Sequence, residues 1–276
     1  MSRLITEGGG DGGFHKPGPA DFDLPPIWGT DFGTFHAFGQ EWVLGVTKPM
    51  LQIVIAAVLV FVFFYVASRK RAMVPGKLQY VGEQGYGFVR NSLGRDIIGS
   101  ADFQRFVPYL FALFFFLLVN NLMGSIPFIQ FPTFSRSGLV YALAALSWII
   151  YNWVGIQKHG FVGYFKLQSV PAGVGGPILL LLIPLEFMSN ILVRPVTLAL
   201  RLFANLFAGH LLLILFALGG EYILAHQPIA YAPVGILAWV LFIVVSFLEL
   251  LIQFLQAYVF VLLTAMYIQG ALADEH

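Results

Sequence analysis

Ionisable side chains interrupt two long apolar runs in the second half of the chain. The first run, residues 177–218, contains Arg201 and His210, and the second, residues 234–273, contains Glu249. A charged side chain at the centre of a membrane helix costs at least about 2.5–3.5 kcal/mol on insertion scales, so such residues usually serve a function. Arginine stays charged at neutral pH, whereas histidine and a desolvated glutamate can exchange protons there. This combination predicts a proton path beside a fixed cation.

Helical spacing gathers the polar side chains of each run on one face. At 100° per residue, five polar side chains of the first run fall within an arc of about 100°. They are Glu186, Asn190, Arg194, Arg201 and Asn205. His210 lies outside this arc, on the other side of the helix. Polar residues of the second run recur at i, i+3, i+7 and i+10 and also share a face, namely Ser246, Glu249, Gln253 and Gln256.

The sequence leaves the partner of Arg201 open. Arg201 could pair with Glu249 or Glu186 merely to fix helix packing, or it could act as a free charge that lowers the proton affinity of an approaching carboxylate. Arg194 could extend its side chain to the nearby membrane edge. We expect His210 and Glu249 to form a proton-relay pair between the two runs.

Composition restricts the chain to the class of membrane proteins. Of its 276 residues, 58% are hydrophobic and 11% are charged, whereas soluble domains carry about 25% charged residues. The net charge of +1 indicates no nucleic-acid partner, and the absence of cysteine excludes disulfides and zinc–cysteine sites. We expect no bound metal or cofactor. There is no glycine-rich phosphate loop, so we also expect no nucleotide site.

Three shorter apolar runs precede the two long ones, at about residues 50–68, 106–126 and 139–156. Each is long enough to cross about 30 Å of hydrocarbon. Residues 72–105 are polar and predict a cytoplasmic segment with an amphipathic surface helix, and the bases after residue 156 predict a cytoplasmic loop. Residues 1–48 lack the apolar core of a signal peptide and predict a flexible tail, which leaves residues 49–276 as a single membrane domain.

The distribution of basic residues predicts the orientation. Nine loop lysines and arginines fall on the side of residues 69–71, and four fall on the opposite side. Because basic loops stay in the cytoplasm, the N-terminus is expected outside and the C-terminus inside.

The two long runs do not fit an ordinary membrane span. They contain 42 and 40 residues, and each would be about 60 Å long as a helix, roughly twice the hydrocarbon thickness. Each run is therefore either two short spans with almost no loop, or one steeply tilted helix. The segment GGEYILAHQPIAYAP, residues 219–233, is expected to link them.

Two segments resemble a known family. RPVTLALRLFANLFAGH, followed by FLELLIQFLQAYVFVLLTAMY, is similar to subunit a of the F-type ATP synthase, and the resemblance extends from the first span to the C-terminus. It implies an all-α polytopic membrane protein with about five membrane helices and a surface amphipathic helix. The last two helices would be long and steeply tilted and would form a hairpin against the ring of c subunits.

The resemblance also implies roles for single residues. Arg201 would stand between two aqueous half-channels, with Asn205 and Gln256 beside it. His210 and Glu249 would serve the outer half-channel. Glu186, together with Asn190, is the candidate for the cytoplasmic half-channel.

The function implied is that of a non-catalytic, proton-conducting stator subunit of F0, which couples proton flow to ring rotation and ATP synthesis. The expected partners are the c-subunit ring, the b-subunit peripheral stalk, the other synthase subunits, membrane lipid and the translocated H⁺. The residues of the c-subunit ring largely determine whether the transported ion is H⁺ or Na⁺. We expect a multi-pass protein of a bacterial cytoplasmic membrane, with an organellar inner membrane as the alternative.

Two rival functions remain open at this point. A secondary transporter could use Arg201 to bind an anionic substrate, although such transporters usually contain internal repeats and broken helices, and no repeat of the arginine segment is found. A purely structural membrane subunit could use the polar stripe for helix packing.

Overall fold

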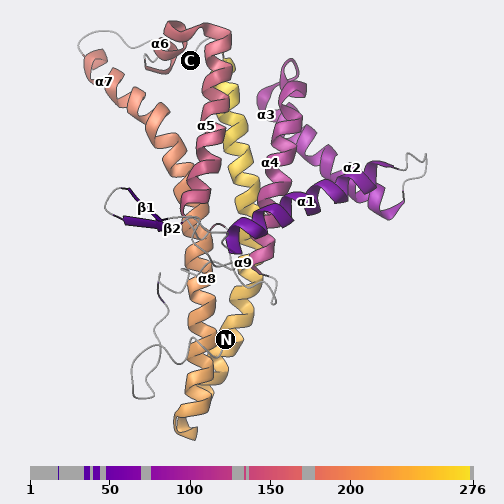
Figure 1. Cartoon of the computed structure of the whole chain (residues 1–276), viewed down its shortest axis with the longest axis vertical. Coiled ribbons are helices and arrows are strands. Elements are labelled where there is room, and N and C mark those ends of the chain that lie inside the picture. The colour runs from indigo at the N-terminus through magenta and orange to yellow at the C-terminus, as the bar shows by residue number, and fades with distance from the viewer. Residues whose placement is uncertain are drawn as a thin grey trace.

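The structure is a computed structural model that describes residues 18, 34–37, 40–43, 48–69, 76–125, 134, 137–169 and 178–273. Helices make up nearly all of this part of the chain, which confirms the predicted all-α class (Figure 1). The elements are β1 (Thr34–Ala37), β2 (Gln40–Val43), α1 (Lys48–Arg69), α2 (Lys77–Phe88), η2 (Val89–Arg95), α3 (Asp96–Ile98), α4 (Phe103–Gly124), α5 (Ser137–His159), α6 (Phe161–Ser169), α7 (Ile178–Phe187), η4 (Met188–Val193), α8 (Arg194–His226), η5 (Ile229–Tyr231) and α9 (Ala232–Leu272).

Five helices are long and apolar enough to cross a membrane, as predicted. They cover Pro49–Arg69, Phe103–Gly124, Gly138–His159, Leu181–His226 and Ile229–Leu272. The second and third begin before the predicted residues 106 and 139, and the third also continues to His159.

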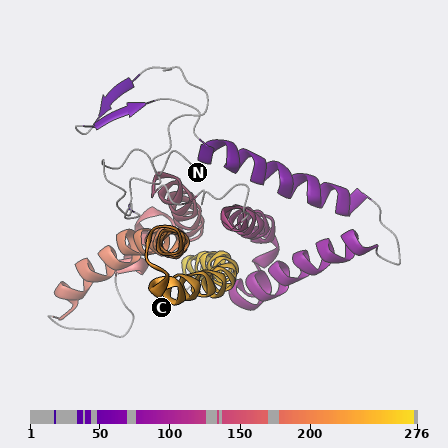
Figure 2. The ribbon, with the colours of Figure 1, turned by 90° about the horizontal axis from the view of Figure 1, so that it is seen from below.

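Each long apolar run is one continuous helix. The helical stretches Leu181–His226 and Ile229–Leu272 contain 46 and 44 residues, so their lengths are about 69 Å and 66 Å. The alternative of paired short spans is therefore wrong. α8 and α9 lie side by side and antiparallel, and both views show α1 and α2 lying across their direction (Figures 1 and 2).

The predicted linker between the long runs is largely helical. α8 continues through the glycine pair to His226, and only a short turn and η5 connect it to α9. A β-carbon on Gly220 would lie 2.9 Å from Cδ1 of Trp239, and one on Gly235 would lie 2.7 Å from Cγ of Leu224. These glycines therefore allow the two helices to approach closely, and Gly220 does not mark a loop.

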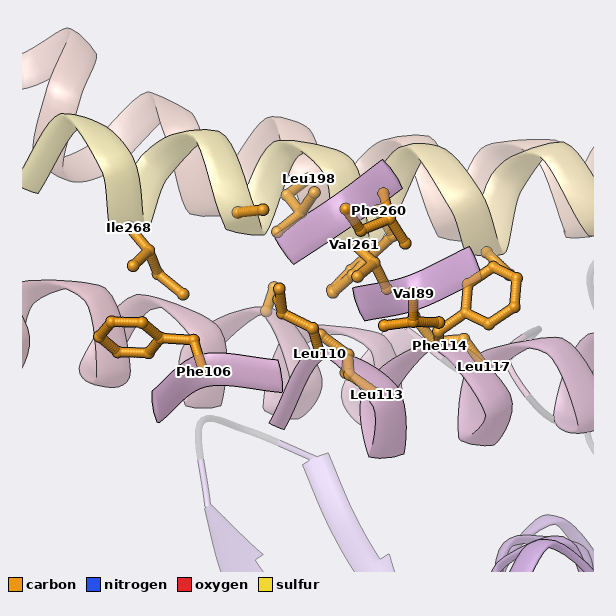
Figure 3. Close-up of a cluster of buried hydrophobic side chains, with 14 of the residues drawn as sticks. Val89, Phe106, Leu110, Leu113, Phe114, Leu117, Leu198, Phe260, Val261 and Ile268 are labelled. Carbon is orange, nitrogen blue, oxygen red and sulfur yellow. The ribbon is translucent and has the colours of Figure 1, made fainter. Parts of the chain in front are cut away.

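The buried core centres on α4. Phe106, Leu110, Phe114 and Leu117 are all at most 5% exposed and recur at helical spacing on one face. They meet residues of α8, α9 and η2, including the fully buried Phe260 (Figure 3). This packing holds the α8–α9 hairpin against the first half of the chain.

Helix α6 and the strands β1 and β2 were not predicted. α6 follows α5 where a loop was expected, and Gly160 with φ +72° makes the turn between them, a backbone conformation that glycine adopts without steric cost. β1 pairs with β2 as an antiparallel hairpin within the range of the predicted flexible tail. Apart from these strands and residue 18, that tail lies outside the described residues up to the start of α1. The segment predicted to carry a surface helix contains α2, η2 and α3.

The first long run is not a regular α-helix throughout. Residues Met188–Val193 form the π-helix η4 between α7 and α8. A π turn contains an extra residue, which rotates the following helix by about 100° relative to a regular one. With this shift Arg201, about 60° from Glu186 on a regular helix, lies about 40° to its other side. The polar residues therefore still share a face, although the π-helix itself was not predicted.

Candidate functional site

A histidine–glutamate pair lies inside the α8–α9 hairpin. His210 Nδ1 is 3.3 Å from Glu249 Oε1, and the two side chains are 10% and 4% exposed. The predicted pairing of these side chains is therefore present. Glu249 Oε2 is buried and has no hydrogen-bond partner in the described part of the chain, which leaves an acceptor free for water or a transferred proton.

Hydrogen bonds extend this pair to the end of α4. Gln253 Nε2 lies 3.3 Å from Glu249 Oε1 and 2.7 Å from Ser125 Oγ, and Asn121 Nδ2 donates to the Gln253 carbonyl at 3.2 Å. A continuous polar chain therefore runs from His210 to Ser125. Sequence reasoning placed Gln253 on the polar face of its helix but missed the α4 residues, although Asn121 and Ser125 are four residues apart and so share one helical face.

A second polar pair joins α8 and α9 on the side of His210 and Glu249 that faces Arg201. Asn205 Nδ2 donates to Gln256 Oε1 at 2.7 Å, and Gln256 Nε2 is buried without a partner among the described residues. Asn205 itself is mostly exposed, whereas Gln256 is buried. The pair therefore stands at the edge of the hairpin interface, between the buried interior and the outer face.

Arg201 lies on the outer face of α8. The helix turns Leu198, Leu202 and Leu206 into the protein and leaves Arg201 exposed, beside the exposed Leu200. Within the described ranges, the Arg201 guanidinium makes no hydrogen bond or ion pair.

The two candidate carboxylate partners are engaged elsewhere. Glu249 contacts His210, and Glu186 Oε2 accepts from Asn190 Nδ2 at 3.2 Å. Neither carboxylate therefore pairs with Arg201, whose side chain faces outward on the same helix face as the exposed Thr197 and Asn205.

Arg194 is held by an aromatic ring. Its guanidinium lies 5.2 Å from the centroid of Tyr267, and the side chain is half-buried. A guanidinium at this distance from a ring face is attracted by the ring quadrupole. Arg194 thus has a local partner in α9, which distinguishes it from Arg201.

The order of these groups along the helix sets what the site can do. At 1.5 Å per residue, Arg201 lies about 14 Å from His210 in one direction and about 22 Å from Glu186 in the other. Groups that can exchange protons therefore flank a cation that cannot. The described residues contain no cluster of His, Asp or Glu that could hold a metal ion.

A family model and individual relatives all match this chain to the same subunit. The family described as ATP synthase A chain matches residues 50–269. ATP synthase subunit a of Nocardioides sp. strain JS614 is 75% identical over 275 residues, which cover 100% of this chain and 99% of the relative. The subunit a of Pseudarthrobacter chlorophenolicus is 47% identical over the full length of both chains. That of Streptomyces lividans is 42% identical over 96% of this chain and 90% of the relative.

Proposed function

Because the chain belongs to the ATP synthase A chain family and is thus the non-catalytic, proton-conducting stator subunit of F0, we propose that Arg201 separates two proton paths that meet the rotor at the α8–α9 hairpin. Family membership also removes the secondary transporter and the purely structural subunit as alternatives. The proposal concerns which residues carry the proton and in which order.

The position of Arg201 is the observation that carries the proposal. An exposed cation without a partner carboxylate among the described residues is costly in hydrocarbon, so this face is expected to meet a partner that bears a negative charge. A carboxylate on the c-subunit ring is such a partner. A fixed cation favours the ionised carboxylate and so promotes loss of its proton, and Arg201 cannot itself carry a proton across.

The uptake path is the polar chain inside the hairpin. Gln253 donates to both Ser125 and Glu249 and so orients them without carrying the proton. A proton that arrives near Ser125 would pass by way of water to the free carboxylate oxygen of Glu249. The pair then gives the proton to an ionised ring carboxylate. Neutralisation lets that carboxylate enter lipid at low cost, since a neutral group has a much smaller desolvation penalty than an anion.

The release path lies on the other side of Arg201. Glu186, which Asn190 binds, accepts the proton when a ring carboxylate returns after nearly a full turn. Arg201 then stabilises the ring anion until it reaches the uptake side. Each transfer conserves charge, because the proton moves between one carboxylate or imidazole and the next.

The proposed orientation follows the basic loops. The ends of α5 and α6 carry Lys158 and Lys166 and would face the cytoplasm. The ring of c subunits would cover the exposed face of α8 and α9, and the b-subunit stalk would hold the chain stationary. The homologues are bacterial, so the proposed location is a bacterial cytoplasmic membrane.

Arg201→Lys tests the proposal. Lysine keeps a cation but is a compact charge that can lose its proton when desolvated, so we expect ATP-driven proton pumping in inverted membrane vesicles to be abolished while the complex stays assembled. Arg194→Lys on the same helix is the matched control and should retain most pumping. Normal pumping by the Arg201→Lys complex would refute the proposal.

A further inference from the structure

A closed ring of hydrogen bonds ties α5, α6 and η4 together, away from the α8–α9 hairpin. Trp148 Nε1 donates to the Ile191 carbonyl at 2.8 Å, and Asn152 Nδ2 donates to the Trp148 carbonyl at 2.7 Å. Tyr164 donates its hydroxyl to Asn152 Oδ1 at 3.0 Å. Gln168 Nε2 donates to the Tyr164 hydroxyl at 3.3 Å, and Asn190 Nδ2 donates to the backbone carbonyl of Gln168 at 2.8 Å. Asn190 is covalently joined to Ile191, which closes the ring.

Tyr164 is the centre of this ring. Its side chain is fully buried, and a β-carbon on Gly155 would lie 2.1 Å from its Cε2 atom. The glycine therefore leaves the space that the tyrosine fills. Burial raises the pKa of Tyr164 to about 12, so its hydroxyl keeps its proton and remains a donor to Asn152.

The hydrogen-bonded ring contacts the π-helix η4 at Asn190 and Ile191. π turns are rare, and the residue four positions after Ile191 is Pro195, which has no N–H to donate to the Ile191 carbonyl. The indole of Trp148 donates to this carbonyl instead. Because a π turn changes the helical phase by about 100°, whatever holds η4 also sets where Glu186 lies relative to Arg201. The second amide hydrogen of Asn190 reaches Glu186 Oε2 directly.

We propose that this ring positions Glu186 for proton release, with Tyr164 as a positioning residue that never touches the proton. The Tyr164 hydroxyl accepts a hydrogen bond from the Gln168 side chain. The Gln168 backbone carbonyl accepts from Asn190, and Asn190 donates to the Glu186 carboxylate. The inference rests on the proposed function for the release role of Glu186. It adds that α6, which carries no member of the proton path, sets the geometry of that path.

A double-mutant cycle tests this inference. Passive proton conductance is measured in F1-stripped membrane vesicles that contain the assembled F0 complex, for Tyr164→Phe, Glu186→Gln and the double variant. Tyr164→Phe removes the hydrogen bonds to Asn152 and to Gln168. Only the bond to Gln168 leads toward Glu186, and the loss of one neutral hydrogen bond predicts a decrease of about fivefold. In the Glu186→Gln background the same change should have almost no further effect, because interacting residues are not additive. Immunoblots of subunit a and of the c subunits show whether each variant complex has assembled.

Tyr109→Phe is the matched control. The Tyr109 hydroxyl is bonded to Ser147 Oγ at 2.8 Å between α4 and α5, and the same deletion there should leave conductance unchanged. The inference is overturned if Tyr164→Phe conducts normally, or if its effect is equally large in the Glu186→Gln background. If Glu186→Gln alone conducts normally, the proposed release role of Glu186 fails as well. Loss of conductance in Glu186→Gln with normal conductance in Tyr164→Phe overturns the positioning role alone.

Discussion

Exchanging the two members of the His210–Glu249 pair gives the sharpest prediction for the uptake path. The single variants are His210→Glu and Glu249→His, and the double variant restores one imidazole and one carboxylate across the same interface. In the native chain these groups are 3.3 Å apart and mostly buried. We expect each single change to reduce proton conduction strongly and the exchange to restore a substantial part of it.

The magnitude follows from the distance. Two carboxylates about 3.3 Å apart repel by about 5 kcal/mol at an effective dielectric constant of about 20, so in His210→Glu one carboxyl retains its proton. If that proton must leave in every cycle, the cost corresponds to a loss of three to four orders of magnitude in rate, as an upper limit. Glu249→His instead leaves two imidazoles and no carboxylate in the pair.

ATP synthesis driven by an imposed proton gradient in membrane vesicles measures the effect, with passive conductance of stripped vesicles as a second readout. His226→Glu is a suitable control, because His226 is exposed at the hairpin tip and stacks on Tyr222 outside the polar chain. The reasoning is refuted if the exchanged variant assembles normally but is no more active than the more active of the two single variants. It is also refuted if His210→Glu is fully active.

Two further predictions concern the hairpin and its polar chain. Gly235→Ala should destabilise the hairpin by about 1–3 kcal/mol, because its β-carbon would overlap Leu224, whereas Gly219→Ala meets no atom within 4 Å and should be neutral or stabilising. The temperature at which the subunit dissociates from the detergent-purified complex measures both, and equal values would contradict the packing argument. Gln253→Leu removes the amide that joins the buried carboxylate to Ser125, which should lower passive proton conductance about fivefold. An unchanged conductance would exclude Gln253 from the uptake path.

Local sequence was enough to predict most of the fold. Apolar length predicted the three shorter spans and the two long apolar runs, because a helix must satisfy its own backbone groups within hydrocarbon. The prediction was wrong for residues 219–226, which were expected to link the long runs and instead continue α8. The close contact with Trp239 that requires Gly220 involves a residue of the opposite helix, which local patterns cannot reveal.

The site was only partly predictable for a similar reason. Regular helical geometry correctly separated His210 from Arg201 and placed Glu249, Gln253 and Gln256 on one buried face. Regular geometry did not predict the π-helix η4, which changes the helical phase between Glu186 and Arg201. The hydrogen bond from Trp148 that supports this π-helix comes from α5.

The sequence alone determined the class of protein, the two long apolar runs and the ionisable groups within them, because burying a charge in lipid is too costly to be accidental. Only the tertiary structure decided which other groups meet. The Glu249–His210 pair was predicted, but the link from this pair through Gln253 to Ser125 and the exposed position of Arg201 were not. Helix composition specifies that polar side chains must find partners, whereas the packing of one helix against another determines the partners.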